Sequence, residues 1–338
     1  MSLRVGIVGC GLIGRKRAEA LGDARLVACM DVDRSKAEAL AGARRGVQIV
    51  ESADALVTRS DIDAVIVATT HDALADVAVA AIDAGKHVLI EKPAGRTVAE
   101  VERVREAATR VGRVVRVGFN HRYHPALQAA RRIVDAGTIG PLMFVRGRYG
   151  HGGRLGYERE WRADPVRAGG GELIDQGVHL IDLAQWFLGP FASIEGAAHT
   201  FFWDMAVDDN AFMHLTTGEG QVAFLHASCS EWKNLFSFEI YGRTGKLHIE
   251  GLGGSYGVER LAHYQMLPAM GPPETTIYEY PGLDRSWQLE FAEFIDDVAH
   301  GRPPSAGLQA ALEALRVVEG IYARSEASVR FVRERMSS

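Results

Sequence analysis

The stretch Gly9-Cys10-Gly11-Leu12-Ile13-Gly14 follows the apolar run Leu3–Val8 and opens a helical pattern over Leu12–Leu21. A strand that passes through a G-x-G-x-x-G turn into a helix is typical of a dinucleotide phosphate site. The first glycine can form the tight turn, the second lets backbone approach the pyrophosphate, and the third lets the helix pack on the strand. Because the helix start offers unpaired N–H groups to phosphates, we predict cofactor contacts at Gly9, Gly11, Leu12, Ile13 and Gly14.

An acidic residue supports this interpretation. Asp31 ends the second apolar run, about 20 residues after the glycines, where a carboxylate accepts hydrogen bonds from the adenosine ribose. A carboxylate there also repels the 2′-phosphate of NADP, so Asp31 favours NAD. Arg34 lies close by and can offset that repulsion, which keeps NADP open as the alternative. We predict that both residues contact the cofactor.

The order of the remaining patterns predicts the fold of residues 1–120. Continuous apolar strands alternate with helices, which is typical of a doubly wound parallel sheet of the Rossmann type, with helices on both faces. The expected strands are Leu3–Val8, Leu26–Asp31, Val47–Val50, Ala64–Ala68, His87–Ile90 and Val114–Gly118, and the expected helices are Leu12–Leu21, Ser35–Ala41, Leu74–Ala84 and Val98–Val111. Such a sheet binds its ligand at the carboxyl ends of the strands.

Residues 121–338 have a different pattern and are expected to form a second domain. Long alternating stretches joined by turns indicate a mainly antiparallel sheet. We expect strands at Met143–Tyr149, Ile194–Trp203, Ala211–Thr216, Gln221–Ser228, Phe236–Tyr241 and Lys246–Glu250, and helices at Pro125–Ala136, Glu172–Leu188, Ser286–Ala299 and Leu308–Ala323. The sequence therefore predicts an α/β protein of two domains.

Composition excludes several classes of function. The chain carries 38 Lys and Arg against 43 Asp and Glu, a net charge of −5, which argues against nucleic-acid binding. No apolar run reaches the roughly 18–20 residues that cross a bilayer. The three cysteines form no C-x-x-C pair, so we expect neither a disulfide framework nor a cysteine metal site, and we expect a cytoplasmic protein.

Two clusters suggest chemistry. Lys92, in Glu91-Lys92-Pro93, follows the fifth strand, where an ammonium group can stabilise the charge that develops on a substrate oxygen; the simpler interpretation is a surface lysine. Asp175 and His179 are four residues apart and share a helix face, and a histidine can accept a hydroxyl proton at neutral pH. Asp182, one turn on, can orient the imidazole, although a plain surface carboxylate or a structural Asp–His pair fits the spacing as well.

Together these motifs resemble the Gfo/Idh/MocA oxidoreductase family. The resemblance rests on the glycine stretch, Glu91-Lys92-Pro93, Gly118-Phe119-Asn120 and the Asp175…His179 pair, and it spans roughly residues 3 to 330. It implies a Rossmann domain followed by an α/β domain with a large open-faced sheet, through which we expect a homodimer or homotetramer. It also implies that Lys92 activates the substrate, that Asp175 binds a substrate hydroxyl, and that His179 is the acid/base. Pro93 could form a cis bond with Lys92.

The chain departs from the family in one place. After the fourth strand the family often reads Ala-Thr-Pro-Asn-x-x-His, whereas this chain has Ala68-Thr69-Thr70-His71-Asp72-Ala73-Leu74. The backbone role beside the cofactor is expected to survive. The further cofactor contacts implied by the resemblance are therefore Thr69, His71, Glu91, Lys92 and Asn120.

The substrate side is less defined. A loop between residues 146 and 167 carries arginines interleaved with aromatic residues, which suits a sugar with an anionic or nucleotide substituent. Each arginine can equally be solvated or paired with a nearby acid. The predicted substrate contacts are Arg122, Tyr123, Arg154, Tyr157, Trp161 and Arg162. His121 and His124 raise the question of a metal, but H-x-x-H alone is a poor ligand signature and we predict no metal site.

Three functions are compatible with these features. The first is NAD(P)-dependent transfer of hydride between a nicotinamide and a secondary hydroxyl of a sugar, polyol or sugar derivative. The second is a redox-neutral step, such as glycoside cleavage or epimerisation, with a recycled and tightly bound NAD. The third is a non-catalytic, NAD(P)-dependent regulatory protein, which the combination of Lys92, Asp175 and His179 argues against.

Overall fold

The computed structural model describes residues 2–269 and 271–336, which divide into two compact units. Unit 1 is formed by the described residues up to Asn120, together with Val166–Gly169 and Trp287–Leu312. Unit 2 is formed by His121–Pro165, Gly170–Ser286 and the described residues from Glu313 on. The assignment of domains to residues 1–120 and 121–338 stays a prediction, and it did not anticipate the later segments of unit 1.

Unit 1 contains a six-stranded parallel sheet in the order β3-β2-β1-β4-β5-β6. The strand order reverses between β1 and β4, and this switch point is where such sheets bind ligands. The strands are β1 Arg4–Val8, β2 Arg25–Met30, β3 Gln48–Ile49, β4 Ala64–Val67, β5 His87–Ile90 and β6 Val115–Val117. The predicted Rossmann fold is confirmed.

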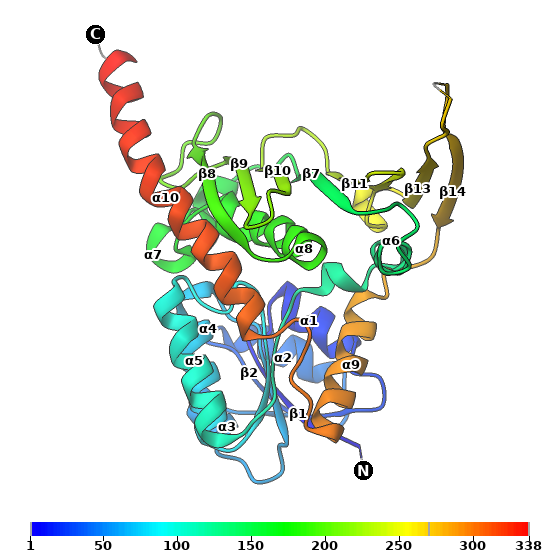
Figure 1. Ribbon diagram of the computed structural model, residues 1–338. Coiled ribbons are helices and arrows are strands. Elements are labelled where there is room, and N and C mark those ends of the chain that lie inside the picture. Colours follow the sequence, from blue (N-terminus) through cyan, green and yellow to red (C-terminus); the bar gives the residue numbers. More distant parts are fainter. Residues whose placement is uncertain (1, 270, 337–338) are drawn as a thin grey trace. The chain divides into compact units, whose positions relative to one another are not determined.

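The helices of unit 1 cover this sheet. Helices α4 and α5 lie side by side (Figure 1), and α4 packs on β4 and β5. The helices are α1 Leu12–Glu19, α2 Arg34–Gly42, α3 Ala53–Val57, α4 His71–Asp83, α5 Val98–Val111 and α9 Ser286–His300. Helix α9 brings Phe291 and Phe294 into the same hydrophobic cluster as Ile7 and Leu40. Burying each phenylalanine contributes about 1.5–3 kcal/mol, so α9 is part of the core of unit 1.

Unit 2 contains an eight-stranded sheet in the order β14-β13-β12-β11-β7-β10-β9-β8. Neighbouring strands are antiparallel except for β7 and β10, which run parallel. The strands are β7 Leu142–Gly150, β8 Phe191–His199, β9 Asn210–Thr217, β10 Val222–Ser228, β11 Leu235–Gly242, β12 Gly245–Glu250, β13 Glu259–Gln265 and β14 Glu274–Tyr280. This mainly antiparallel sheet confirms the predicted fold class.

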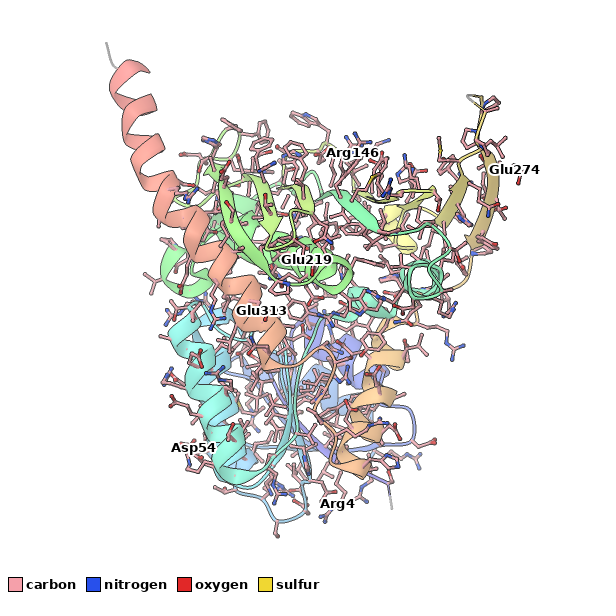
Figure 2. All side chains as sticks on the ribbon, viewed as in Figure 1. Arg4, Asp54, Arg146, Glu219, Glu274 and Glu313 are labelled. Atoms are coloured by element: carbon pink, nitrogen blue, oxygen red, sulfur yellow. The ribbon has the colours of Figure 1, made fainter. Side chains whose placement is uncertain are left out.

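Helices lie against one face of the eight-stranded sheet. Helix α8 (Val178–Leu188) packs on β7 and β10, and α6 (Pro125–Asp135) packs on β12, β13 and β14 (Figure 1). The other face is open: Arg146 of β7, labelled in Figure 2, is half exposed there and pairs with Glu239 of β11. The last helix that the structure describes is α10 (Leu308–Met336). The short elements are η1 Asn120–Tyr123, η2 Tyr157–Arg159, η3 Trp161–Ala163, α7 Pro165–Ala168, η4 Leu173–Gly177 and η5 Gly254–Tyr256.

Several predicted elements of unit 2 were wrong in their bounds. The strand expected at Ile194–Trp203 is β8, which ends at His199 because the next residues turn around the carboxylate of Asp209. The sequence analysis missed strands β13 and β14. Most side chains of β14 are exposed, so its sequence shows no alternation between buried apolar and exposed polar residues. The helix expected at Leu308–Ala323 continues to Met336 as α10.

Candidate active site

The glycine turn has the geometry that its sequence predicts. Gly9 has φ +95°, and a Cβ there would lie 2.3 Å from the carbonyl oxygen of Ala68. A Cβ on Gly14 would lie 1.9 Å from the carbonyl oxygen of Gly9, so only glycine lets α1 pack this closely on β1. At Gly11, by contrast, a Cβ would meet no protein atom within 4 Å. Two of the glycines therefore serve the fold, and Gly11 leaves the loop surface open.

The start of α1 fits a dinucleotide phosphate. The helix begins at Leu12 with Gly11 as its N-cap, and no side chain caps it. In its first turn, Leu12 is exposed, Ile13 is half buried, and no side chain is acidic. Backbone N–H groups at this end of a helix carry partial positive charge, which stabilises a pyrophosphate. The residues present thus fit the cofactor that the sequence predicts.

Asp31 is fixed against this turn. One carboxylate oxygen accepts from the backbone N–H of Cys10 at 2.7 Å, and the other accepts from the N–H of Asp33 at 2.8 Å. Each oxygen keeps a lone pair for a ribose hydroxyl. The nearby Arg34 is exposed and forms ion pairs with Glu38 at 3.0 Å and Glu51 at 2.8 Å. Its guanidinium is therefore already engaged by two carboxylates.

The loop after β4 supplies the next predicted contacts. Thr69 follows β4 directly, and Thr70 is the N-cap of α4. His71 is buried, and its Nδ1 lies 2.9 Å from the carbonyl oxygen of Ala168. A ring held in this way by a backbone carbonyl is turned toward residue 168. The contacts of Thr69 and His71 with the cofactor stay predictions.

Glu91 has a partner that the sequence did not reveal. Its carboxylate accepts from Nε of Arg17 at 2.6 Å, and Arg17 also contacts Glu290 of α9 at 2.5 Å. Arg17 lies on α1, shortly after the glycine turn in sequence, and it is fully buried. A Cβ on Gly118 would lie 2.6 Å from Nη2 of Arg17, so the glycine after β6 makes room for this ion pair. One buried guanidinium thus joins α1, the end of β5 and α9.

Lys92 follows Glu91 and is half buried. The Lys92–Pro93 peptide bond is cis. Asn120, the last residue of this part of unit 1, is buried at the start of η1. The predicted cofactor contacts from Gly9 to Asn120 therefore all lie in unit 1, at the carboxyl ends of β1, β2, β4 and β5 or just past β6.

In unit 2, Asp175 lies in a π-helical turn. The sequence predicted one regular helix over Glu172–Leu188, but η4 is π-helical and only α8 is a regular α-helix. The buried carboxylate of Asp208 accepts the backbone N–H groups of Gly171 and Leu173, both at 2.8 Å, and so holds the turn. Burial raises the pKa of Asp208. Single π turns are frequent at functional sites, and this one carries Asp175.

His179 is the second buried group of this site. Its ring stacks on that of His121, with ring centroids 3.8 Å apart and planes 25° apart. The ring of Tyr149, at the end of β7, lies 5.1 Å from His121 and 6.1 Å from His179. Burial raises the pKa of the Tyr149 hydroxyl. Sequence reasoning missed Tyr149, for which the only signal was its place at the end of a strand.

The arginines around this site are paired with acids. Arg162 donates to Asp175 at 2.8 Å, and the Asp175 carboxylate raises the pKa of that guanidinium. Arg122 pairs with Asp182 at 2.5 Å, so the carboxylate of Asp182 holds an arginine, and its role in orienting the imidazole stays a prediction. The exposed Arg154 pairs with Glu160.

The other predicted substrate residues are aromatic. Tyr123 is buried, and Tyr157 is buried with its ring 5.4 Å from that of His151. Trp161 lies under the guanidinium of Arg162, which is 4.5 Å from its ring centroid. Burial raises the pKa of Tyr157 and lowers that of His151. Unit 2 thus brings Asp175, Arg162, Tyr157 and Trp161 into one neighbourhood.

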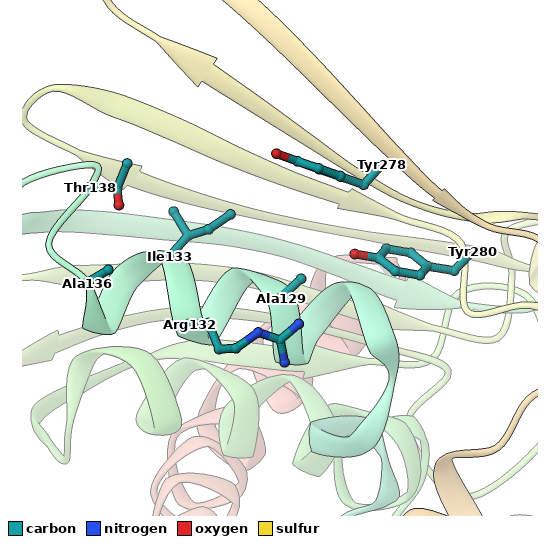
Figure 3. A pocket seen from close by; sticks show the side chains of 7 residues that line it. All are labelled: Ala129, Arg132, Ile133, Ala136, Thr138, Tyr278 and Tyr280. Atoms are coloured by element: carbon teal, nitrogen blue, oxygen red, sulfur yellow. The ribbon is translucent and has the colours of Figure 1, made fainter.

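Two other features bear on the predictions. Among the side chains that the structure describes, no three from His, Cys, Asp or Glu are grouped as a metal ion requires. Instead, His124 contacts the buried carboxylate of Glu259 at 2.9 Å. An open groove of about 330 Å³ lies between α6 and β14, lined by Arg132, Tyr278 and Tyr280 among others (Figure 3). It contains none of the predicted site residues.

Comparison with known proteins identifies the class. Residues 3–119 match a family model described as an oxidoreductase family with an NAD-binding Rossmann fold, and residues 127–248 match the GFO/IDH/MocA C-terminal domain. The chain is thus an oxidoreductase with an NAD-binding Rossmann domain. It belongs to the Gfo/Idh/MocA family, so the predicted family and the predicted NAD-binding Rossmann domain are confirmed.

Individual relatives are similar over different lengths. Inositol 2-dehydrogenase 2 of Saccharopolyspora erythraea is 32% identical over 205 residues, which are 59% of this chain and 58% of that protein. Inositol 2-dehydrogenase of Salmonella typhimurium is 27% identical over 322 residues, 90% of this chain and 88% of that protein. The structure of levoglucosan dehydrogenase in complex with NADH and levoglucosan shares the fold, with a TM-score of 0.87 at 22% identity, over 97% of this chain and 98% of that one.

Among the residues that the structure describes, none of the helices combines the length and apolar character that crossing a membrane requires.

Proposed function

We propose that this chain oxidises a secondary hydroxyl of a neutral sugar or polyol, with NAD as the hydride acceptor. The observation that carries the proposal is the buried pair in unit 2: Asp175, held by Arg162, and His179, stacked on His121. A histidine and a carboxylate on consecutive helical turns suit a substrate with neighbouring hydroxyls. The relatives named inositol 2-dehydrogenase and levoglucosan dehydrogenase bear names of such polyhydroxylated compounds.

The proposed roles follow the charge changes of the reaction. His179 accepts the hydroxyl proton, and the ammonium group of Lys92 stabilises the negative charge that develops on that oxygen. Asp175 accepts a hydrogen bond from a neighbouring hydroxyl and so orients the ring. When bound, NAD supplies the hydride acceptor. The alcohol loses one proton and one hydride, and the products are a ketone, the reduced cofactor and a proton.

The cofactor is proposed to be NAD in preference to NADP. Asp31 places a carboxylate beside the glycine turn through its bond to Cys10, where it would repel a 2′-phosphate. Arg34, the nearby cation, is held by Glu38 and Glu51. The ion pairs of Arg34 with Glu38 and Glu51, together with the position of Asp31, support NAD over NADP. Thr69, His71, Glu91, Lys92 and Asn120 stay proposed contacts of the cofactor.

The substrate is proposed to be neutral because the candidate arginines already have anionic partners. Arg122, Arg154 and Arg162 pair with Asp182, Glu160 and Asp175, respectively. A sugar with an anionic or nucleotide substituent would have to displace one of these carboxylates. Tyr123, Tyr157 and Trp161 are then proposed to contact the sugar through their rings.

The assembly and location of the protein are proposals as well. We propose a homodimer or homotetramer that buries the open face of the eight-stranded sheet, since Phe212 and Phe224 are exposed on it. We propose a cytoplasmic enzyme, in keeping with the buried free thiols of Cys10, Cys29 and Cys229.

The function is tested with a panel of polyols, sugars, uronates and nucleotide sugars, following reduced cofactor by absorbance. Lys92→Ala and His179→Asn should each lower kcat by at least about a hundredfold while NADH still binds, as measured by its fluorescence. His300→Asn, at an exposed histidine of α9, is the matched control and should retain activity.

Other outcomes separate the alternatives. Product formed without net NADH would show a recycled cofactor in place of a dehydrogenase. Cofactor binding without oxidation of any compound in the panel would favour a regulatory protein. Full activity of Lys92→Ala would reject the role assigned to that lysine.

A further inference from the structure

Two loops of unit 2 present four aromatic residues together. Phe201, Phe202 and Trp203 follow β8, and Trp232 follows β10; we call them the aromatic platform. The exposed fractions are 78% for Trp232, 67% for Phe201 and 50% for Phe202. The ring centroids of Phe202 and Trp232 lie 4.9 Å apart, and those of Phe202 and Trp203 lie 5.1 Å apart. Single exposed apolar residues are common, but a contiguous aromatic patch marks a binding surface.

A buried carboxylate holds the first of these loops. Asp209 is fully buried and accepts the backbone N–H groups of Phe201, Phe202 and Trp203 at 2.8, 2.7 and 2.9 Å. The indole N–H of Trp203 donates to the carbonyl oxygen of Cys229 at 2.8 Å, which ties this loop to the second one. Three consecutive aromatic residues are thus fixed by charge-assisted hydrogen bonds, so binding a ligand would order little additional chain.

The second loop is fixed in an uncommon conformation. Trp232 has φ +60°, which side chains with a Cβ seldom adopt. The neighbouring chain is built to accommodate both tryptophans: a Cβ on Gly152 would lie 3.0 Å from the Trp232 backbone, and one on Gly153 would lie 2.3 Å from the Trp203 ring. Backbone strain of this kind tends to persist where it serves function.

The platform is continuous with the candidate site of unit 2. The ring of Tyr157 lies 5.5 Å from that of Trp203 and 5.4 Å from that of His151. Nε2 of His151 in turn lies 3.6 Å from Oε1 of Glu172, which directly precedes the π-helical turn that carries Asp175. A path of aromatic rings therefore runs from the neighbourhood of Asp175 through Tyr157 to exposed Phe202 and Trp232.

We propose that the aromatic platform is a second sugar-binding subsite, so that the substrate is a disaccharide or other glycoside whose oxidised ring lies at Asp175 and His179. The inference rests on the proposed function. The C–H faces of a pyranose ring are apolar and slightly positive, and they match the negative face of an aromatic ring. The platform side chains carry no charge, which suits a neutral second ring.

The experiment compares monosaccharides with disaccharides in steady-state kinetics. Glucose, galactose and their methyl glycosides are set against cellobiose, maltose and lactose, in the wild type, Phe202→Ser and Trp232→Ser. Both replaced rings are exposed, so the variants should keep the wild-type melting temperature. Tyr278→Ser is the matched control, because Tyr278 is exposed on β14, at the opposite edge of the same sheet.

We expect a higher kcat/KM for at least one disaccharide than for its monosaccharides, and a loss of about three- to tenfold in that preference for each platform variant. The monosaccharide values and the control should not change. Equal values for monosaccharides and disaccharides in the wild type would overturn the subsite. It would also be overturned if the platform variants changed the sedimenting mass but left the preference intact, since the patch would then contact a second copy.

Calorimetric titration separates this proposal from the proposed function. Cellobiose, maltose and lactose are titrated into the NAD-loaded Lys92→Ala protein, with and without Trp232→Ser. Binding that depends on Trp232 would support the subsite even if no sugar were oxidised, in which case only the proposed function would fail. Absence of binding in both proteins would overturn the subsite.

Discussion

Arg17 and Glu91 form an ion pair of 2.6 Å in the interior of unit 1, and Glu91 is the residue directly before Lys92. The pair connects the helix of the glycine turn to the loop of the proposed catalytic lysine. Arg17 also contacts Glu290, and its guanidinium lies 4.5 Å from the ring centroid of Trp287. Helix α9 therefore helps to fix both the helix of the glycine turn and the loop before Lys92. Removal of one partner of such a buried pair leaves the other charge buried, which typically costs 3–5 kcal/mol.

Glu290 should make the stability of the protein depend on pH. Burial, opposed by the charge of Arg17, raises the pKa of its carboxyl from 4.5 to about 7. The unfolded chain therefore loses this proton first as pH rises, and the folded state loses stability between pH 4.5 and 7. Relative to Glu290→Gln, we expect the wild type to lose up to roughly 3 kcal/mol of unfolding free energy across that window.

Urea unfolding at intervals across this pH range measures the difference. Asp296→Asn, at an exposed carboxylate of the same helix, is the control and should follow the wild type. Parallel curves for the wild type and Glu290→Gln would show that Arg17 compensates the burial fully.

The two glycines of the turn should fail in different ways when replaced by alanine. Gly14→Ala puts a Cβ 1.9 Å from a backbone oxygen, so the folded state should lose several kcal/mol, on the order of 3, together with NADH binding. Gly11→Ala meets no protein atom within 4 Å, and Gly11 has φ −67°, which alanine adopts readily. This variant should keep its melting temperature and lose about tenfold or more in NADH affinity. Thermal melts and fluorescence titration separate the two effects.

Asp31→Asn should alter the choice of cofactor. The amide oxygen can still accept from the N–H of Cys10, but the negative charge that opposes a 2′-phosphate is removed. We expect NAD to bind about tenfold more weakly and the ratio of NADP to NAD affinity to rise. Asp33→Asn is the matched control, because asparagine also caps α2 well. An unchanged ratio in Asp31→Asn would argue that this carboxylate does not face the ribose.

Two arginines of unit 2 should differ in importance although both were predicted to bind substrate. Arg162→Gln removes the partner of the buried Asp175, and we expect kcat/KM to fall by at least about a hundredfold. Arg154→Gln breaks an exposed pair with Glu160, for which a loss of less than about 1 kcal/mol is expected. Kinetics on the best substrate of the panel decide between them, and equal losses would mean that Arg154 contacts the substrate directly.

Local patterns were sufficient to predict the nucleotide-binding unit. Each of its central strands is a continuous apolar run, as in Ala64–Val67, where all four residues are fully buried. Glycines at fixed spacing and an acid at the end of β2 depend on neighbours in sequence, so their geometry follows from the motif. The fold class and the glycine turn were therefore predictable.

Contacts between distant residues were not predictable. The π-helical turn at Asp175 depends on Asp208, 33 residues later, and the bounds of β8 depend on Asp209. The sequence analysis assigned no role to Arg17, whose partner Glu290 lies 273 residues later on α9. Strand β14 could not be predicted because nearly all of its side chains are exposed, so its sequence lacks the apolar and polar alternation of a half-buried strand. In each case the deciding partner lies far along the chain.

The return of residues 287–312 to unit 1 has a consequence for synthesis on the ribosome. Arg17 and Arg116 emerge early, yet their carboxylates Glu290 and Asp297 are translated some 180 or more residues later. A nascent chain that has reached residue 120 can pair the six strands, but it holds these guanidinium groups without α9. The nucleotide-binding unit therefore completes its folding only after residues 287–312 have been translated, and a fragment cut after Asn120 would be an unstable substitute for it.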